Sequence, residues 1–305
     1  MLRDPRHYDY APYRGRPKIR WPNGARIAFW VAPNIEHYEL DPPANPVRSP
    51  WLRPNPDVLN YSWRDYGNRV GFDRMADVMA RHGVRGSVSL NVALCDHFPD
   101  IIARCNALGW ELFSHGIYNT RYFYGLSEAE QRAAIRDSRE TIFSYSGQSL
   151  DGWLSPAISN TDETQHLLAE EGILYTLDFM HDDQPMPFKV RTGRLISVPY
   201  SLEVNDVPLF VQRQCAPDAY VDILKAQFDQ LYAEGEDNGT VMCIPLHPYL
   251  IGQPHRIGAL DEVLRYITSH DKVWLATGRE IAKWYINHHH DEVTRWLASI
   301  NTEAA

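Results

Sequence analysis

Short apolar runs alternate along most of the chain with longer stretches in which apolar side chains recur every three or four positions. The short runs predict buried strands and the periodic stretches predict amphipathic helices. The predicted strands cover residues 26–32, 86–92, 110–114, 152–155, 173–177, 195–199, 241–246 and 272–276. The predicted helices cover residues 70–82, 96–108, 127–145, 161–171 and 256–268, a segment around 220–232, and a segment that begins at 279.

Capping residues support several of these helix boundaries. Ser127 followed by Glu130 has the spacing of a capping box, and Thr161 is a suitable N-cap for the next helix. Gly83 and Gly172 stand where two helices are expected to end. The alternation of strand and helix is therefore marked by local signals as well as by hydrophobicity.

Strands that alternate with helices in one chain of 305 residues predict a single α/β domain, a distorted (β/α)7–8 barrel. An open doubly wound sheet is the alternative, although the chain lacks the glycine-rich nucleotide motifs typical of that class. We expect the barrel to span residues 26–290. Residues 1–25, rich in Pro, Arg and Tyr, are expected to form an extended arm, and residues 291–305 a C-terminal tail.

Composition narrows the classes of partner. The apolar fraction of 44% suits a large core, and the net charge of -9 argues against nucleic acid or an anionic membrane as partner. No apolar run approaches the roughly 20 residues of a membrane span, and the first residues lack the pattern of a signal peptide. We therefore expect a cytoplasmic protein. Its four scattered cysteines predict neither a zinc knuckle nor a disulfide framework.

Polar side chains follow the predicted strands where each strand ends. The segment WELFSHGIYN brings His115 and Asn119 after one strand, and VMCIPLH ends in His247. In a β/α barrel the carboxyl ends of the strands share one rim, so residues far apart in sequence meet there. Further candidates at strand ends are Asn34, Glu36, Ser155, Asp182 and Asp183.

Histidine and carboxylate groups in one cleft supply the acids and bases that amide hydrolysis needs. We predict Glu36, His115, Asp183 and His247 as catalytic residues. The predicted substrate-binding residues are Asn34, Trp63, Arg64, Tyr66, Arg69, Asn119, Ser155 and Asp182. Taken singly, each has a structural alternative, because a histidine can brace a turn and a loop carboxylate can cap a helix or form an exposed ion pair.

The chain resembles the polysaccharide deacetylase superfamily, also called carbohydrate esterase family 4, which carries the nodulation-deacetylase homology. The resemblance rests on GWELFSHGIYN, SEAEQRAAI, GWLSPAISNTDETQHLLAEEGI, the Asp182–Pro185 run, and IPLHPYLIGQPHRIGALDEVLRYI with VWLATGREIAKWY, in the family's order. It implies a distorted deacetylase-type barrel. The pattern is most similar to a cytoplasmic branch of allantoinases and cyclic-imide hydrolases.

The family implies two aspartates after the first strand, one as general base and one as metal ligand, and two histidines that complete the metal site. Those positions here correspond to Asn34 and Glu36 and to His115 and Asn119. The family's general acid is retained as His247, and its fourth-strand arginine corresponds to Leu154 in GWLSP. Only Glu36 and His115 remain as metal ligands, fewer than the three usual in catalytic zinc sites.

The resemblance implies a hydrolase of non-peptide carbon–nitrogen bonds that opens or cleaves a small ureide or cyclic imide. Glu36 or His115 would then be the base, His247 the acid, and Asn34 and Asn119 donors to the substrate carbonyl. A metal-free site is favoured over a weakly bound divalent metal such as zinc. Two alternatives stay open: a metal-dependent deacetylase of an N-acetylated sugar, and an inactive barrel that binds a metabolite or carbohydrate. The implied assembly is a homo-oligomer, for which a tetramer is expected.

Overall fold

The computed structural model describes residues 6–44 and 54–302. Its strands are β1 (Ile27–Ile35), β2 (Ser87–Leu90), β3 (Glu111–Ser114), β4 (Gly152–Trp153), β5 (Tyr175–Thr176), β6 (Met186–Pro187), β7 (Ile196–Ser197), β8 (Thr240–Leu246) and β9 (Val273–Leu275). Each predicted strand coincides with one of these. The apolar pattern did not predict β6, the short strand that pairs with β7.

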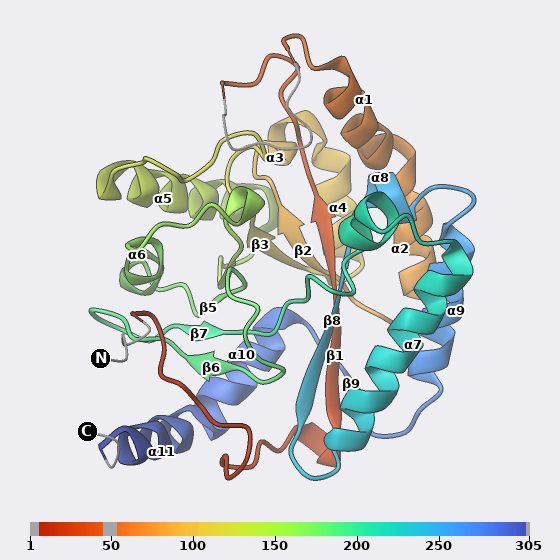
Figure 1. Cartoon of the computed structure of the whole chain (residues 1–305). Coiled ribbons are helices and arrows are strands. Elements are labelled where there is room, and N and C mark those ends of the chain that lie inside the picture. Colours follow the sequence, from red (N-terminus) through yellow and green to blue (C-terminus); the bar gives the residue numbers. More distant parts are fainter. Residues whose placement is uncertain (1–5, 45–53, 303–305) are drawn as a thin grey trace.

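One curled sheet contains all nine strands, in the order β6-β7-β5-β4-β3-β2-β1-β8 with β9 also paired to β1. Every pairing is parallel except that of β6 with β7. β8 covers one edge of β1 along residues 27–33, while β9 and then β2 share its other edge. The sheet is therefore a barrel that does not close by strand pairing between β6 and β8, as Figure 1 shows.

β1 is buried along its whole length and divides the core into two parts. Ile27, Phe29 and Val31 pack with the helices outside the sheet, while Ala28 and Trp30 face the barrel interior with residues of β5, β7 and β8. Side chains on a strand alternate between its faces, so a continuous apolar run is required where both faces are covered. This explains why the run IAFWVA, residues 27–32, has no polar position.

The principal helices are α1 (Val58–Tyr66), α2 (Phe72–Arg81), α3 (Leu94–His97), α4 (Pro99–Ala107), α5 (Glu128–Ser146), α6 (Thr164–Glu170), α7 (Pro217–Glu234), α8 (Pro248–Ile251), α9 (Ile257–Thr268), α10 (Gly278–His288) and α11 (His290–Thr302). A π-helical segment, Gly67–Gly71, joins α1 to α2, and another covers Pro208–Gln212. Short 3-10 turns cover Pro22–Gly24 and Pro156–Ile158.

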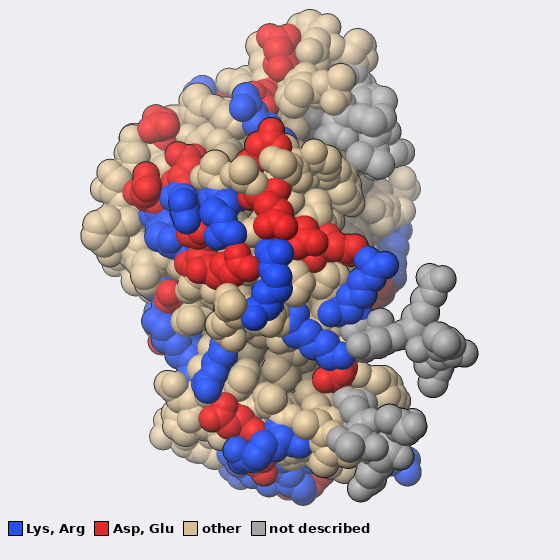
Figure 2. All heavy atoms as spheres, turned by 90° about the vertical axis from the view of Figure 1, so that its left-hand side faces the viewer, with Lys and Arg blue, Asp and Glu red and all other residues tan. Residues whose placement is uncertain are grey.

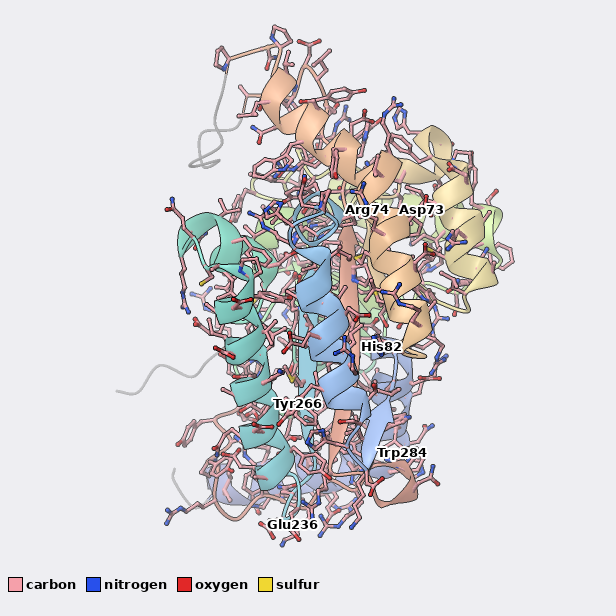
Figure 3. The ribbon with its side chains drawn as sticks, turned by 90° about the vertical axis from the view of Figure 1, so that its right-hand side faces the viewer. Asp73, Arg74, His82, Glu236, Tyr266 and Trp284 are labelled. Atoms are coloured by element: carbon pink, nitrogen blue, oxygen red, sulfur yellow. The ribbon has the colours of Figure 1, made fainter. Side chains whose placement is uncertain are left out.

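The helices predicted from periodicity are all present, with small changes at their ends. Ser127 and Glu130 form the expected capping box at α5, and Thr277 with Glu280 forms another at α10. Figure 3 shows α7, α9 and α2 side by side over the outer face of the sheet. Helix α1 was missed, because it follows the Pro-rich stretch 42–56, of which 45–53 lie outside the described residues.

Both ends of the chain pack on the barrel. In the arm, Arg16 forms an ion pair with Asp182 at 2.7 Å, and Ile19 and Trp21 are buried. The expectation of a C-terminal tail from residue 291 is wrong for its described part, because α11 continues to Thr302. Its apolar side chains are spaced as one helical stripe, of which Val293 and Leu297 are buried.

The face that carries α5 and α6 is strongly charged but mixed in sign. Arg132 and Arg136 of α5 both bind Glu171, which ends α6. Figure 2 shows Lys and Arg side chains interleaved with Asp and Glu over this side of the molecule. Across the described residues, no helix has the length and apolar character needed to cross a membrane.

Candidate active site

Three side chains from the carboxyl ends of three strands meet at the rim of the barrel. Glu36 follows β1, His115 follows β3 and His247 follows β8. The Nε2 atoms of His247 and His115 lie 3.5 and 3.9 Å from the same atom, Oε1 of Glu36. All three side chains are buried, so the sequence prediction that these residues converge is confirmed.

Each histidine is oriented through its other ring nitrogen. His115 Nδ1 lies 2.9 Å from the carbonyl oxygen of Leu154, which can only accept a hydrogen bond, so this nitrogen carries a proton. His247 Nδ1 lies 2.6 Å from Oδ1 of Asp206, and its backbone N–H donates to Oδ2 of the same carboxylate. Both Nε2 atoms are thereby directed at Glu36.

The two histidines are held in opposite protonation states. Burial lowers the pKa of His115, more than the nearby Glu36 carboxylate raises it, so its Nε2 carries a lone pair at neutral pH. Burial also opposes the charge of His247, but Asp206 and Glu36 outweigh it and raise its pKa to about 9. Glu36 itself is buried, yet His247, Arg64 and His115 lower its pKa to about 2. One carboxylate thus lies between a base and an acid.

Arg64 supplies a fixed positive charge beside Glu36. Its Nε lies 3.6 Å from Glu36 Oε2, and its guanidinium stacks over Tyr38 at 3.9 Å and faces Tyr249 at 4.5 Å. An Nη1 hydrogen bond to Asn60, one turn earlier in α1, fixes the side chain further. A guanidinium placed between aromatic faces is well suited to a buried ion pair.

These groups line a pocket of about 210 Å³. The lining residues are Asn34, Glu36, Tyr38, Arg64, His115, Asn119, Leu154, Ala157, Ile158, Met180, Tyr200, Leu202, Asn205, Val207, Pro208, Gln212, His247 and Tyr249. The volume is below the roughly 300–1,000 Å³ of pockets for drug-sized ligands, so a small molecule fits it best.

The wall after β4 has strained backbone. Ala157 and Ile158 line the pocket with φ angles of 51° and 54°, a conformation that L-residues, and β-branched ones above all, rarely adopt. Gly116, in the turn after His115, has φ 71°, and a Cβ there would come 2.4 Å from the Pro156 ring. The two loops interlock closely, which keeps the Leu154 carbonyl against His115.

The side-chain amides of Asn34 and Asn119 differ in their hydrogen bonds. Asn34 Nδ2 is within hydrogen-bond distance of the Ala32 and Leu246 carbonyls and of the Tyr200 hydroxyl. Its amide therefore ties β1 to β8, and the expectation that it donates to a substrate carbonyl is wrong in this arrangement. Asn119 is also buried; its Nδ2 donates to the Tyr38 hydroxyl at 3.1 Å, and its side chain acts on His115 in the direction that raises the pKa of that histidine.

Four predicted substrate-binding residues are not among those that line the pocket. Trp63 packs edge to face on Tyr249, and the Tyr66 hydroxyl accepts from Arg74. Arg69 is exposed on the outer side of its π-helical turn and pairs with Asp65 at 2.6 Å. Ser155 is fully buried behind His115, where Asp178 accepts hydrogen bonds from its hydroxyl and backbone N–H.

Asp182 and Asp183 lie at the wrong end of the barrel for the roles predicted for them. The Asp183 carbonyl accepts from Val241 N–H at the start of β8, whereas His247 follows the end of that strand. At about 3.3 Å per residue the two places are roughly 20 Å apart.

Asp182 and Asp183 line a separate cavity of about 920 Å³ with Glu236. Figure 3 shows Glu236 at the bottom of the molecule and Arg74, which binds the carbonyl of Gly252 just after α8, in its upper half. The predicted catalytic role of Asp183 and substrate role of Asp182 do not fit this arrangement, because Asp182 pairs with Arg16 of the arm and the Asp183 backbone lies at the start of β8.

Sequence patterns missed the carboxylate that orients His247. Asp206 lies in the loop after β7, is fully buried, and has no motif around it in SLEVNDVP. Tyr38, Tyr200 and Asn68 were also missed. The Nδ2 of Asn68 donates a hydrogen bond of 3.0 Å to the backbone carbonyl oxygen of Glu36 and so fixes the backbone there. The only signal of these missed residues in the sequence is position: Tyr38, Tyr200 and Asp206 follow predicted strands, and Asn68 precedes the predicted helix 70–82.

The donor set does not fit the zinc site of the family. Within 6–44 and 54–302, no three His, Cys, Asp or Glu side chains are disposed to hold a metal ion. Glu36 already faces the Arg64 guanidinium, and His247 is held as a cation. Asn119 offers a neutral amide where the family has an imidazole, so the residues present satisfy neither the number nor the charge of ligands that zinc requires.

Fold and site together define an α/β barrel protein with an acid–base cluster at the carboxyl ends of its strands. Residues 59–176 match the family model described as polysaccharide deacetylase, so this part of the chain is similar to that family. A relative from Schizosaccharomyces pombe, named "Putative polysaccharide deacetylase", is 28% identical over 298 residues, which cover 88% of this chain and 93% of the relative.

Two solved structures share the fold over nearly the whole chain. A probable polysaccharide deacetylase from Pseudomonas aeruginosa PAO1 superposes with a TM-score of 0.79 at 29% identity, covering 90% of this chain and 96% of that one. PuuE allantoinase superposes with a TM-score of 0.78 at 26% identity, covering 90% and 95%. The deacetylase-type barrel expected from the sequence is confirmed.

Proposed function

We propose that the protein hydrolyses a carbon–nitrogen bond other than a peptide bond in a small amide, of the ureide or cyclic-imide type. The observation that carries the proposal is the pair of imidazoles whose Nε2 atoms face one carboxylate oxygen in opposite protonation states. Hydrolysis of an amide requires a base that activates water and an acid that protonates the leaving nitrogen, and the two imidazoles can take these roles on either side of the scissile bond. The similarity to PuuE allantoinase supports the same class of substrate.

In this mechanism His115 Nε2 takes a proton from water while the water oxygen bonds to the substrate carbonyl carbon. Glu36 stabilises the imidazolium that forms and holds the water, since its own pKa of about 2 makes it the weaker base at neutral pH. Collapse of the tetrahedral intermediate breaks the carbon–nitrogen bond, and His247 Nε2–H protonates the leaving nitrogen. The products are a carboxylic acid and the released amine or amide nitrogen.

Replacing His247 by Ala tests the role of the acid directly. We expect kcat for allantoin and small cyclic imides to fall by about 10²–10⁴-fold, the usual contribution of general acid–base catalysis. His255 is exposed, so His255→Ala is a matched control that should leave turnover unchanged. Undiminished turnover in His247→Ala would remove this residue from the mechanism.

A metal-dependent deacetylase of an N-acetylated sugar is the second candidate, because the name of the Schizosaccharomyces pombe relative points to that class. It requires a bound ion, which Asn34, Glu36, His115 and Asn119 are poorly suited to hold. Elemental analysis of the purified protein, combined with turnover of N-acetyl sugars with and without chelator, distinguishes the two. Binding of ligands without turnover of any amide would instead support an inactive barrel.

A further inference from the structure

The carbonyl oxygen of Asn119 is a buried acceptor in the pocket. The side chain is only 5% exposed, and its Nδ2 donates to the Tyr38 hydroxyl at 3.1 Å. Its Oδ1 has no hydrogen-bond partner among the residues that the structure describes. A buried polar atom in this state costs free energy unless a ligand or a water satisfies it.

The neighbouring groups on this side of the pocket are acceptors as well. His115 uses its Nδ1–H on the Leu154 carbonyl, so the Nε2 that it turns to the pocket carries a lone pair. Glu36 is an ionised carboxylate, which only accepts. The side of the pocket formed by Glu36, His115 and Asn119 is therefore complementary to a ligand that brings hydrogen-bond donors.

The sheet order places this acceptor on the side of the substrate opposite to the leaving group. Glu36 follows β1, His247 follows β8 on one flank, and His115 and Asn119 follow β3 on the other flank. The leaving nitrogen must face His247 to receive its proton. The group that faces Asn119 then belongs to the acyl side of the scissile carbonyl.

We infer that Asn119 is a specificity-determining residue whose Oδ1 accepts a hydrogen bond from an N–H on the acyl side of the substrate, which selects ureides over acetyl groups and simple imides. The inference rests on the proposed amide hydrolysis. An acetyl methyl or a ring methylene at this place leaves the buried oxygen unpaired, whereas the ring or chain nitrogen of a ureide satisfies it.

Three small rings probe the inference. Hydantoin and succinimide share the same imide, and hydantoin has an N–H where succinimide has a methylene. That nitrogen, N1, is on the acyl side when C2 is attacked and lies across the ring from the scissile bond when C4 is attacked, so in neither case is it the leaving nitrogen that faces His247. 1-Methylhydantoin keeps the nitrogen but lacks its proton. The measurement is kcat/KM for each ring with the wild-type protein and with Asn119→Leu, which removes both the donor and the acceptor.

We expect the wild-type preference for hydantoin over each of the other two rings to fall about tenfold or more in Asn119→Leu. Comparing the same ratio between two proteins cancels the different intrinsic reactivities of the rings. Tyr38→Phe removes only the hydroxyl that anchors the amide and should reduce the preference less. Met180→Leu replaces an apolar lining residue by another apolar residue and should leave the ratio unchanged. Thermal unfolding confirms that each variant is folded.

Two outcomes overturn the inference in distinguishable ways. If the wild-type protein hydrolyses the rings and the ratios are the same in Asn119→Leu, the proposed function stands and the role of Asn119 is refuted. If the wild-type protein hydrolyses no ureide and no imide, the proposed function is refuted and the inference falls with it. A preference that is lost in Asn119→Leu and partly kept in Tyr38→Phe supports it.

Discussion

Replacing Asp206 by Asn tests the electrostatics on which the proposed acid depends. Asp206 binds His247 Nδ1 at 2.6 Å and helps to raise the pKa of that histidine to about 9. Compared with its usual value of 6.5, this corresponds to about 3 kcal/mol of preferential stabilisation of the imidazolium. Asn keeps the shape and one hydrogen-bond acceptor but removes the charge, and its amide NH2 cannot accept the second of the two hydrogen bonds from His247.

The expected result is a change in the alkaline limb of the pH profile of kcat/KM. In the wild-type protein, activity should decline as the pH rises through about 9, where His247 loses its proton. If the pKa falls to 6.5 in the variant, the protonated fraction at pH 8 drops from about 90% to about 3%, a loss of about 30-fold. Activity at pH 6 should change much less.

The acidic limb provides an internal reference, because it belongs to a different group. Burial lowers the pKa of His115 below 6.5, so activity should be lost as the pH falls through that lower value, in both proteins. Asp178→Asn is the matched control, since Asp178 is an equally buried carboxylate that binds Ser155 instead of His247. It should leave the alkaline limb in place. An alkaline limb that stays near pH 9 in Asp206→Asn would refute the reasoning.

A second readout of the same variant does not need a substrate. The pKa of His247 is raised in the folded protein, so the pair with Asp206 contributes stability that is fully present below pH 6.5 and is lost as the pH rises through about 9. The difference in the free energy of unfolding between wild type and Asp206→Asn should therefore shrink over that range. Denaturant unfolding at several pH values measures it.

Three further outcomes are expected. Dialysis against a chelator should leave kcat for imides unchanged, and a loss that added zinc restores would contradict the metal-free site. Arg64→Met should lower the free energy of unfolding by about 3–5 kcal/mol, the usual effect of breaking a buried ion pair, because it leaves Glu36 buried beside one cation fewer. Arg69→Met, which removes an exposed arginine from the same segment, is its control and should be nearly neutral in denaturant unfolding. Asp183→Asn should keep kcat/KM within about twofold, since it lies roughly 20 Å from His247, and a large loss would restore it as a catalytic candidate.

The sequence by itself determined the strands, the helices and the ends of the strands from which the site is built. Short, continuous apolar runs such as residues 27–32 indicate strands covered on both faces, and parallel strands bring their carboxyl ends to one rim. That is why Glu36, His115 and His247 could be grouped in advance. The same logic failed for Asp183, because the segment after β5 runs back toward the arm before β6 begins.

Only the tertiary structure decided how these side chains are paired and charged. Whether a histidine is an acid or a base depends on what its second nitrogen contacts, and those contacts come from distant loops: Leu154 for His115 and Asp206 for His247. Asp206 has no local signal because its role arises from burial against a residue 41 positions away. Sequence spacing carries information about backbone periodicity, whereas pKa depends on desolvation and on neighbouring charges, which exist only once the chain is folded.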